Sequence, residues 1–139
     1  MEKNMKDNNC IFCKIANGEI PSRTIEENEL FRVVLDVGPA TRGHALILPK
    51  EHCRNLYDLP EETSSEVLKM AKKVALKMKD KLHCDGVNLV QNNEEAAGQT
   101  VFHFHMHVIP RFSNDNQNIG WKPGQPTAEE LDAVAEELK

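Results

Sequence analysis

HFHMHV, residues 103–108, places three of the six histidines of the chain on alternate positions. In an α-helix these residues would scatter around the axis, because side chains two positions apart point about 200° away from each other. In an extended strand, side chains two positions apart point to the same face. We therefore predict a strand over 101–109, ended by Pro110, that has an imidazole face and an apolar face.

Three aligned imidazoles indicate a functional site rather than ordinary packing, because burying them without partners would leave several hydrogen bonds unmade. As metal ligands they would hold Zn²⁺ with an open position for water, although no acidic general base flanks the strand. If the site instead acts on a phosphate group, one neutral imidazole would attack phosphorus and a second would protonate the leaving group. The polar loop just upstream favours phosphate, since Asn92, Gln99 and Thr100 offer neutral hydrogen-bonding groups and Gly98 permits a close approach.

The composition is that of a single globular domain. The chain has 139 residues, 40% of them hydrophobic and 28% charged, and a net charge of −5. Such a chain offers no electrostatic surface for nucleic acid or anionic lipid, and no apolar run reaches the length of a membrane span. Residues 1–9 are polar and lack the apolar stretch of a signal peptide. We therefore expect a flexible tail over 1–9, a domain over 10–139 and a cytoplasmic protein.

Turn residues and apolar periodicity divide the rest of the chain into short strands and helices. Apolar residues at a 3-4 spacing predict one long helix over 61–82, opened by a capping box of Asp58 and Glu61. Thr127 and Glu130 form a second capping box, which opens a helix within the C-terminal tail 113–139. We also predict a short helix over 10–17 and strands over 23–25, 30–36, 44–48 and 87–91. This order favours an α+β fold with a mainly antiparallel sheet.

Residues 103–109 resemble the motif of the histidine triad (HIT) family, in which histidine alternates with hydrophobic residues, at every position. Three longer stretches are similar to the same family: CIFCKIANGEIPS, LDVGPATRGHALILPKEH and QNNEEAAGQTVFHFHMHVIPR. The similarity covers about residues 10–112 and is greatest to bacterial nucleotide-binding HIT hydrolases. It implies the HIT fold, a twisted antiparallel sheet of about five strands with one long helix and a C-terminal helix. It also implies a homodimer whose sheets join.

The resemblance implies a nucleotide hydrolase or transferase that acts at the α-phosphate of a purine nucleotide. The substrate would be a nucleoside phosphoramidate, a dinucleoside polyphosphate or an acyl-adenylate. His105 would be the nucleophile of a covalent nucleotidyl-histidine intermediate, His107 would contact the phosphate and aid the leaving group, and His44 would support the triad from behind.

The same resemblance assigns the nucleotide-binding residues. Asn92, Gln99 and Thr100 would bind phosphate, and Asp36 would bind the ribose hydroxyls. The apolar walls of the base pocket would be Ile11, Phe12, Ile15, Val37 and Leu46. Two departures from the family pattern are Thr100, where serine is frequent, and residues 93–97, where glycine is frequent.

Cys10 and Cys13 form a C-x-x-C pair, which by itself fits a redox motif, a metal site or plain packing. The resemblance implies that His52 and His103 complete a tetrahedral Cys₂His₂ zinc site, which would be structural because it has no open position. It implies no redox or organic cofactor.

Two other functions remain open from the residues. One is a nucleotide-binding interaction module with vestigial catalysis, and the other is a metallohydrolase that uses the three triad histidines. In a homodimer, the tail around Trp121 would reach toward the partner's active site.

Overall fold

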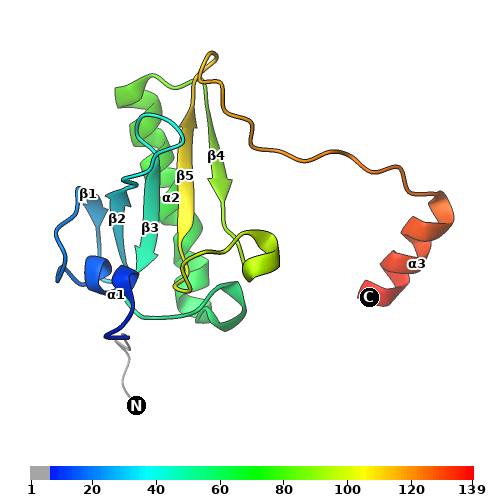
Figure 1. Ribbon diagram of the computed structural model, residues 1–139, viewed down its shortest axis with the longest axis horizontal. Coiled ribbons are helices and arrows are strands. Elements are labelled where there is room, and N and C mark those ends of the chain that lie inside the picture. Colours follow the sequence, from blue (N-terminus) through cyan, green and yellow to red (C-terminus); the bar gives the residue numbers. More distant parts are fainter. Residues whose placement is uncertain (1–6) are drawn as a thin grey trace.

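The computed structural model describes residues 7–139, so residues 1–6 of the expected N-terminal tail lie outside the described residues. Five antiparallel strands form one sheet in the order β1-β2-β3-β5-β4, which confirms the predicted fold class (Figure 1). In chain order the elements are α1 (Ile11–Ala16), β1 (Thr24–Glu27), β2 (Phe31–Leu35), β3 (Ala45–Pro49), η1 (Leu56–Asp58), α2 (Glu61–Leu82), β4 (Gly86–Val90), η2 (Glu95–Ala97), β5 (Met106–Arg111) and α3 (Ala128–Leu138).

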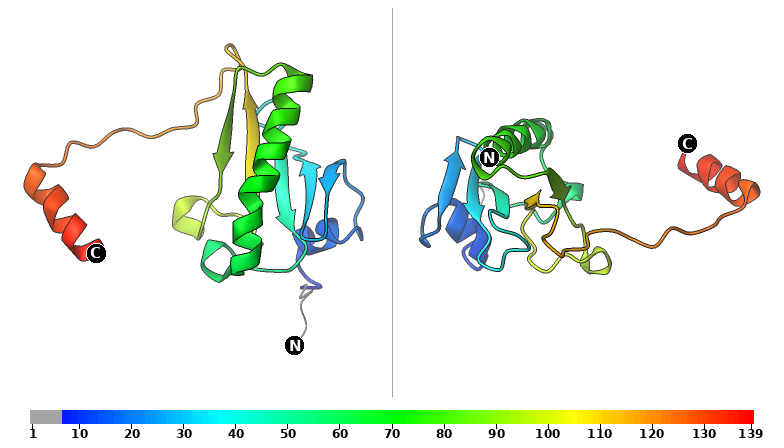
Figure 2. Two further views of the ribbon diagram at one scale, coloured as in Figure 1. Left: turned by 180° about the vertical axis from the view of Figure 1, so that it is seen from behind. Right: turned by 90° about the horizontal axis from the view of Figure 1, so that it is seen from above.

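The two faces of the sheet carry different helices. The long helix α2 covers one face and the short helix α1 the other (Figure 2). Along β3, Ala45 and Ile47 join the larger core under α2, whereas Leu46 and Leu48 join a smaller cluster with α1. Because alternate residues face opposite sides and both sides are covered, β3 is apolar throughout.

Helix α2 matches the predicted range 61–82, and its buried stripe includes Val67, Met70 and Val74. The predicted capping box at its start is wrong. Pro60 precedes the helix without a side-chain cap, and Asp58 instead accepts the backbone N–H of Asn55. Asp58 and Asn55 thus form the capping box of η1, which occupies the turn before α2. Within residues 7–139, no helix combines the length and apolarity that crossing a membrane requires.

The histidine strand is shorter than predicted: β5 begins at Met106, not at residue 101, and continues through Pro110 to Arg111. Before Met106 the chain forms no strand ladder, because the Phe104 N–H donates to the carbonyl of Cys53 and two imidazoles take backbone carbonyls. His103 Nε2 donates to the carbonyl of Pro49 at 2.9 Å, and His105 Nδ1 donates to the carbonyl of His103 at 2.7 Å. Pro110 needs no ladder partner toward β3, because that pairing ends at Val108.

The predicted separation of the two faces holds along this segment. Phe104, Met106 and Val108 pack in the core under α2. His105 and His107 lie on the opposite side and line a cavity beside α1.

A long arm carries the C-terminal helix away from the sheet. After β5 the chain runs past β4 and ends in α3, which stands apart from the rest of the molecule (Figures 1 and 2). Arg111 and Asp115 form an ion pair at the root of the arm, and Gln117 donates to the carbonyl of Ala40. The predicted capping box of Thr127 and Glu130 is present.

Candidate functional site

A cavity of about 230 Å³ opens between α1 and the sheet, on the face opposite α2. Its apolar wall comes from α1, β2 and β3: Phe12, Ile15, Val34, Leu46 and Leu48. Its polar residues are Ser22, Arg23, Asp36, Thr100, His105 and His107. The cavity therefore combines an apolar slot with a few convergent polar groups, which is the usual form of a small-molecule site.

His105 presents an unprotonated nitrogen to this cavity. Its Nδ1 lies 2.7 Å from the carbonyl oxygen of His103, and a carbonyl only accepts, so Nδ1 carries the proton. In the neutral ring the lone pair is therefore on Nε2. Burial lowers the pKa of His105, which keeps the ring neutral. Phe12 holds the ring edge-on, with centroids 5.0 Å apart.

His44 fixes the tautomer of His107. The backbone N–H of Ala40 donates to His44 Nδ1 at 2.9 Å, so the neutral His44 carries its proton on Nε2. That N–H donates to His107 Nδ1 at 2.9 Å, and His107 then carries its proton on Nε2. Burial lowers the pKa of His107 to about 4, with the neighbouring imidazoles acting in the same direction. His107 is therefore a neutral ring with an N–H donor.

Asp36 lies at the end of this relay and lines the cavity. Its Oδ1 accepts the backbone N–H of Gly38 at 2.8 Å, and its Oδ2 lies 3.5 Å from His44 Nε2. Asp36, His44 and His107 are close enough to suit a metal ion. However, the proton on His44 Nε2 makes this a hydrogen-bonded relay, because a ligand nitrogen needs a free lone pair.

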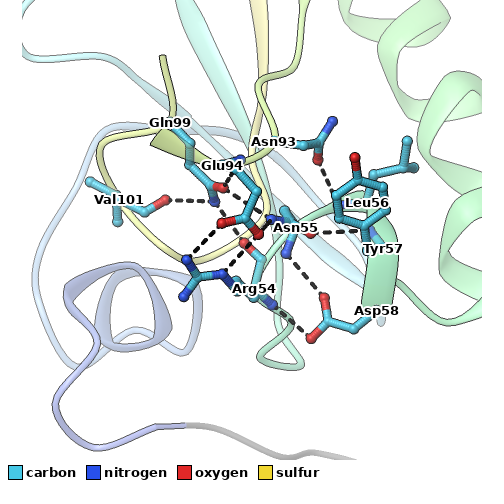
Figure 3. A network of polar contacts seen from close by, with 9 residues as sticks. All are labelled: Arg54, Asn55, Leu56, Tyr57, Asp58, Asn93, Glu94, Gln99 and Val101. Atoms are coloured by element: carbon cyan, nitrogen blue, oxygen red, sulfur yellow. Dashed lines mark hydrogen bonds and ion pairs between the residues drawn. The ribbon is translucent and has the colours of Figure 1, made fainter. Parts of the chain in front are cut away.

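Gln99 is a structural residue rather than an open phosphate ligand. Its side chain is buried. Its Nε2 donates to the carbonyls of Arg54 and Val101, and its Oε1 accepts from Asn55 and from the backbone of Glu94 (Figure 3). These four bonds use the full capacity of the amide. The geometry thus disfavours the expected contact of Gln99 with phosphate and gives it the task of shaping the loop before the triad.

A second set of contacts that holds this loop was not predicted from the sequence. Glu94 has φ of +75°, which is strained for a residue with a side chain. Its carboxylate accepts from Arg54 at 2.8 and 3.1 Å and from Asn55 at 2.7 Å (Figure 3). The Arg54 hydrogen bond, the largest cause, lowers the pKa of Glu94 to about 2. Ionic bonds between segments 40 residues apart thus hold a backbone conformation that elsewhere needs glycine.

The structure gathers most of the predicted nucleotide-binding residues, although not all. Phe12, Ile15, Asp36, Val37, Leu46 and Thr100 line the cavity, as do His105 and His107. Ile11 is 52% exposed and faces a separate polar hollow beside Arg54. Asn92 is half-buried next to Gly98 and does not line the cavity. Ser22 and Arg23 do line it, but as single polar residues at the start of a predicted strand they carried no distinguishing signal.

Cys10, Cys13, His52 and His103 form a second cluster at the N-terminus of α1. Their ligand atoms all lie within 4.8 Å of one another. Cys13 Sγ is 3.2 Å from His52 Nδ1 and 3.4 Å from His103 Nδ1. Because His103 Nε2 donates to Pro49, its Nδ1 lone pair faces the sulfurs. Two thiols and two imidazoles at this spacing fit a tetrahedral zinc ion.

Burial raises the pKa of the Cys13 thiol to about 11. Ligand thiols are deprotonated when a metal binds. A bound cation would therefore supply the positive charge that stabilises the buried Cys13 thiolate. The triad is therefore divided between two tasks: His103 joins the sulfur cluster, while His105 and His107 line the cavity.

Comparisons with known proteins agree with this arrangement. The HIT domain family matches residues 17–114. An adenosine 5'-monophosphoramidase of Schizosaccharomyces pombe is 36% identical over 130 residues, covering 93% of this chain and 95% of the relative. A crystal structure of a Streptococcus mutans protein aligns with a TM-score of 0.92 at 38% identity, covering 99% of this chain and 88% of the other.

A zinc-bound histidine triad protein from Mycobacterium smegmatis aligns with a TM-score of 0.76 at 38% identity, covering 94% of this chain and 95% of the other. The match to the HIT domain covers most of the chain, and the curated relative matches nearly end to end. The chain therefore belongs to the HIT family.

Proposed function

We propose that this protein is a nucleotide hydrolase that works through a covalent intermediate on His105. The observation that carries the proposal is the hydrogen bond from His105 Nδ1 to the His103 carbonyl, which leaves the Nε2 lone pair free beside the cavity. Phosphoramidase activity in a relative of 36% identity supports chemistry at an α-phosphate. The substrate class is a purine nucleotide whose α-phosphate carries a nitrogen, phosphate or acyl leaving group.

Each side chain of the cavity has a part in this reaction. The base lies in the apolar slot, and Asp36 accepts hydrogen bonds from the ribose hydroxyls. His105 Nε2 attacks the α-phosphorus as the bond to the leaving group breaks. The leaving group departs with the bonding electron pair, accepts a hydrogen bond from the His107 N–H and takes its proton from solvent water. A second water then attacks phosphorus, the electron pair of the breaking P–N bond returns to His105 Nε2, and the proton of that water passes to solvent.

We further propose that zinc at the Cys₂His₂ cluster is structural. Four protein ligands leave no open position for water. When bound, the ion would supply a cross-link that ties the segment before α1 to His52 and His103. Among the four residues of this cluster, His103 is the one that contacts a triad residue of the cavity, because its carbonyl orients His105 while its ring lies in the cluster.

A homodimer is part of the proposal. Leu68 and Leu76 on α2 and Leu89 on the edge strand β4 are exposed apolar side chains. Leu89 pairs with Val108 and therefore faces the α2 side of the sheet. A second copy placed against this edge would cover all three side chains and extend the sheet.

His105→Ala provides the decisive test, with His83→Asn as the matched control because His83 is exposed at the end of α2. We expect His105→Ala to lose turnover of adenosine phosphoramidate by at least about a thousandfold while AMP still binds in a calorimetric titration. Acid-quenched wild-type protein should show a nucleotidyl adduct on the peptide containing His105.

Activity retained in His105→Ala, without an adduct in the wild-type protein, would refute covalent catalysis. A wild-type protein that binds AMP but turns over no nucleotide would instead indicate an interaction module.

A further inference from the structure

Helix α3 is an acidic amphipathic helix whose apolar stripe touches nothing in its own copy. Leu131, Val134 and Leu138 follow a helical spacing and are 58%, 51% and 82% exposed. Asp132 and Glu137 flank this stripe on opposite sides. Every residue of the helix is exposed.

A helix of this kind is not expected to persist alone. It has 11 residues, and isolated helices shorter than about 12–15 residues are marginal in water. Its last turn carries Glu136 and Glu137 and no basic residue, so these charges oppose the helix dipole. Its stability therefore requires a partner surface that is apolar and basic.

Such a surface lies at the other end of the sheet. A groove of about 350 Å³ runs between the C-terminal half of α2 and the first two strands. Its floor is apolar and consists of Ile25, Leu35, Val74, Met78 and Leu82. Its edge is basic, with Arg42, Lys77 and Lys81. Lys77 is paired with Glu26, whereas Arg42 and Lys81 have no ion-pair partner within residues 7–139.

We propose that the groove of one copy binds α3 of a second copy. The apolar stripe would lie on the groove floor, and Asp132 and Glu137 would face Arg42 and Lys81. The arm leaves its own domain past β4, whereas the groove lies by β1 at the opposite edge of the sheet (Figure 1). An extended arm of residues 112–127 spans up to roughly 50 Å, which is enough to cross to a neighbour. The inference rests on the proposed homodimer and adds a reciprocal exchange of helices to it.

The test exchanges charge between the two surfaces. One full-length variant carries Arg42→Glu and Lys81→Glu, and the other carries Asp132→Lys and Glu137→Lys. Each variant alone should raise the dissociation constant of its homodimer by roughly tenfold, since two opposite-charge contacts per groove become like-charge contacts. Mixing the two variants restores both contacts only if each helix docks on the other copy. Native mass spectrometry should then show heterodimer in at least about tenfold excess over random mixing.

Hydrogen exchange of residues 128–138 gives an independent readout. The wild-type helix should be protected, each variant alone should exchange faster, and the mixture should recover the protection. Glu129→Lys with Glu136→Lys is the charge-matched control, because both residues are exposed on the side of α3 opposite its apolar stripe.

Random mixing together with unchanged exchange of α3 would overturn the proposal. Recovery in a chain carrying all four substitutions, but not in the mixture, would overturn it too, because it would show that α3 binds its own copy. These experiments measure assembly alone, so their failure is distinct from a failure of the proposed hydrolase activity, which the His105→Ala assay detects.

Discussion

Acid should destabilise the folded chain through His107. Burial lowers the pKa of this ring from 6.5 to about 4. Between these two values the folded chain binds fewer protons than the unfolded chain, so a falling pH favours unfolding. Each pH unit in this window costs about 1.4 kcal/mol per such group. Lowering the pH from 6.5 to 5.0 should therefore remove about 2 kcal/mol of folding free energy through His107 alone, and no further loss from it is expected below about pH 4.

His107→Gln isolates this contribution. The glutamine amide oxygen can still accept the N–H of His44, so the relay keeps a partner while the titrating group is lost. Urea unfolding followed by circular dichroism, at pH 6.5, 6.0, 5.5 and 5.0 and equal zinc, gives the free energy of unfolding for both proteins. The wild type should lose about 1–2 kcal/mol more than the variant over this range. Parallel losses in the two proteins would refute the assignment of His107 as a buried neutral ring.

Three further predictions follow from the cluster, the loop and the cavity. Cys13→Ser should lose zinc in elemental analysis and lower the melting temperature by roughly 10 °C, whereas Cys53→Ser, outside the cluster, should keep its zinc; stoichiometric zinc in Cys13→Ser would contradict the ligand set. Gln99→Ala should cost about 2–4 kcal/mol in urea unfolding, because it leaves several buried partners unpaired, and a loss below about 0.5 kcal/mol would rule out the structural role. Phe12→Ala should weaken AMP binding by roughly 5–30-fold in calorimetry, while Ile11→Ala should not change it; equal effects would show that the base does not lie in this slot.

Much of this fold follows from local sequence patterns. The 3-4 spacing of apolar residues predicts α2 at the range that the structure shows, and Thr127 with Glu130 predicts the start of α3. The alternation in residues 103–108 predicts that His105 and His107 lie opposite Phe104, Met106 and Val108, as the structure shows. In α2 and in residues 103–108 the local preference coincides with burial, and at the start of α3 the capping box acts in an exposed helix, so no tertiary contact overrides the pattern.

The errors have two sources. At Asp58 a second local capping box competes, because the backbone N–H of Asn55, three residues earlier, takes the Asp58 carboxylate. The other errors depend on tertiary partners. The start of β5 could not be predicted, because the Pro49 carbonyl bonds an imidazole instead of a strand. The role of Gln99 depends on Asn55, which lies 44 residues away in sequence. No local pattern encodes such pairings.

His103 takes part in both sites, so the orientation of the His105 ring depends on the structure of the segment before α1. Its imidazole belongs to the sulfur-bearing cluster, while its peptide oxygen keeps the proton of His105 on Nδ1 and so leaves Nε2 as the proposed nucleophile. A chelator or an oxidant acting on the two cysteines would therefore alter chemistry in a cavity that neither cysteine lines. A substitution of His103 would therefore disturb the cluster and the orientation of the His105 ring together.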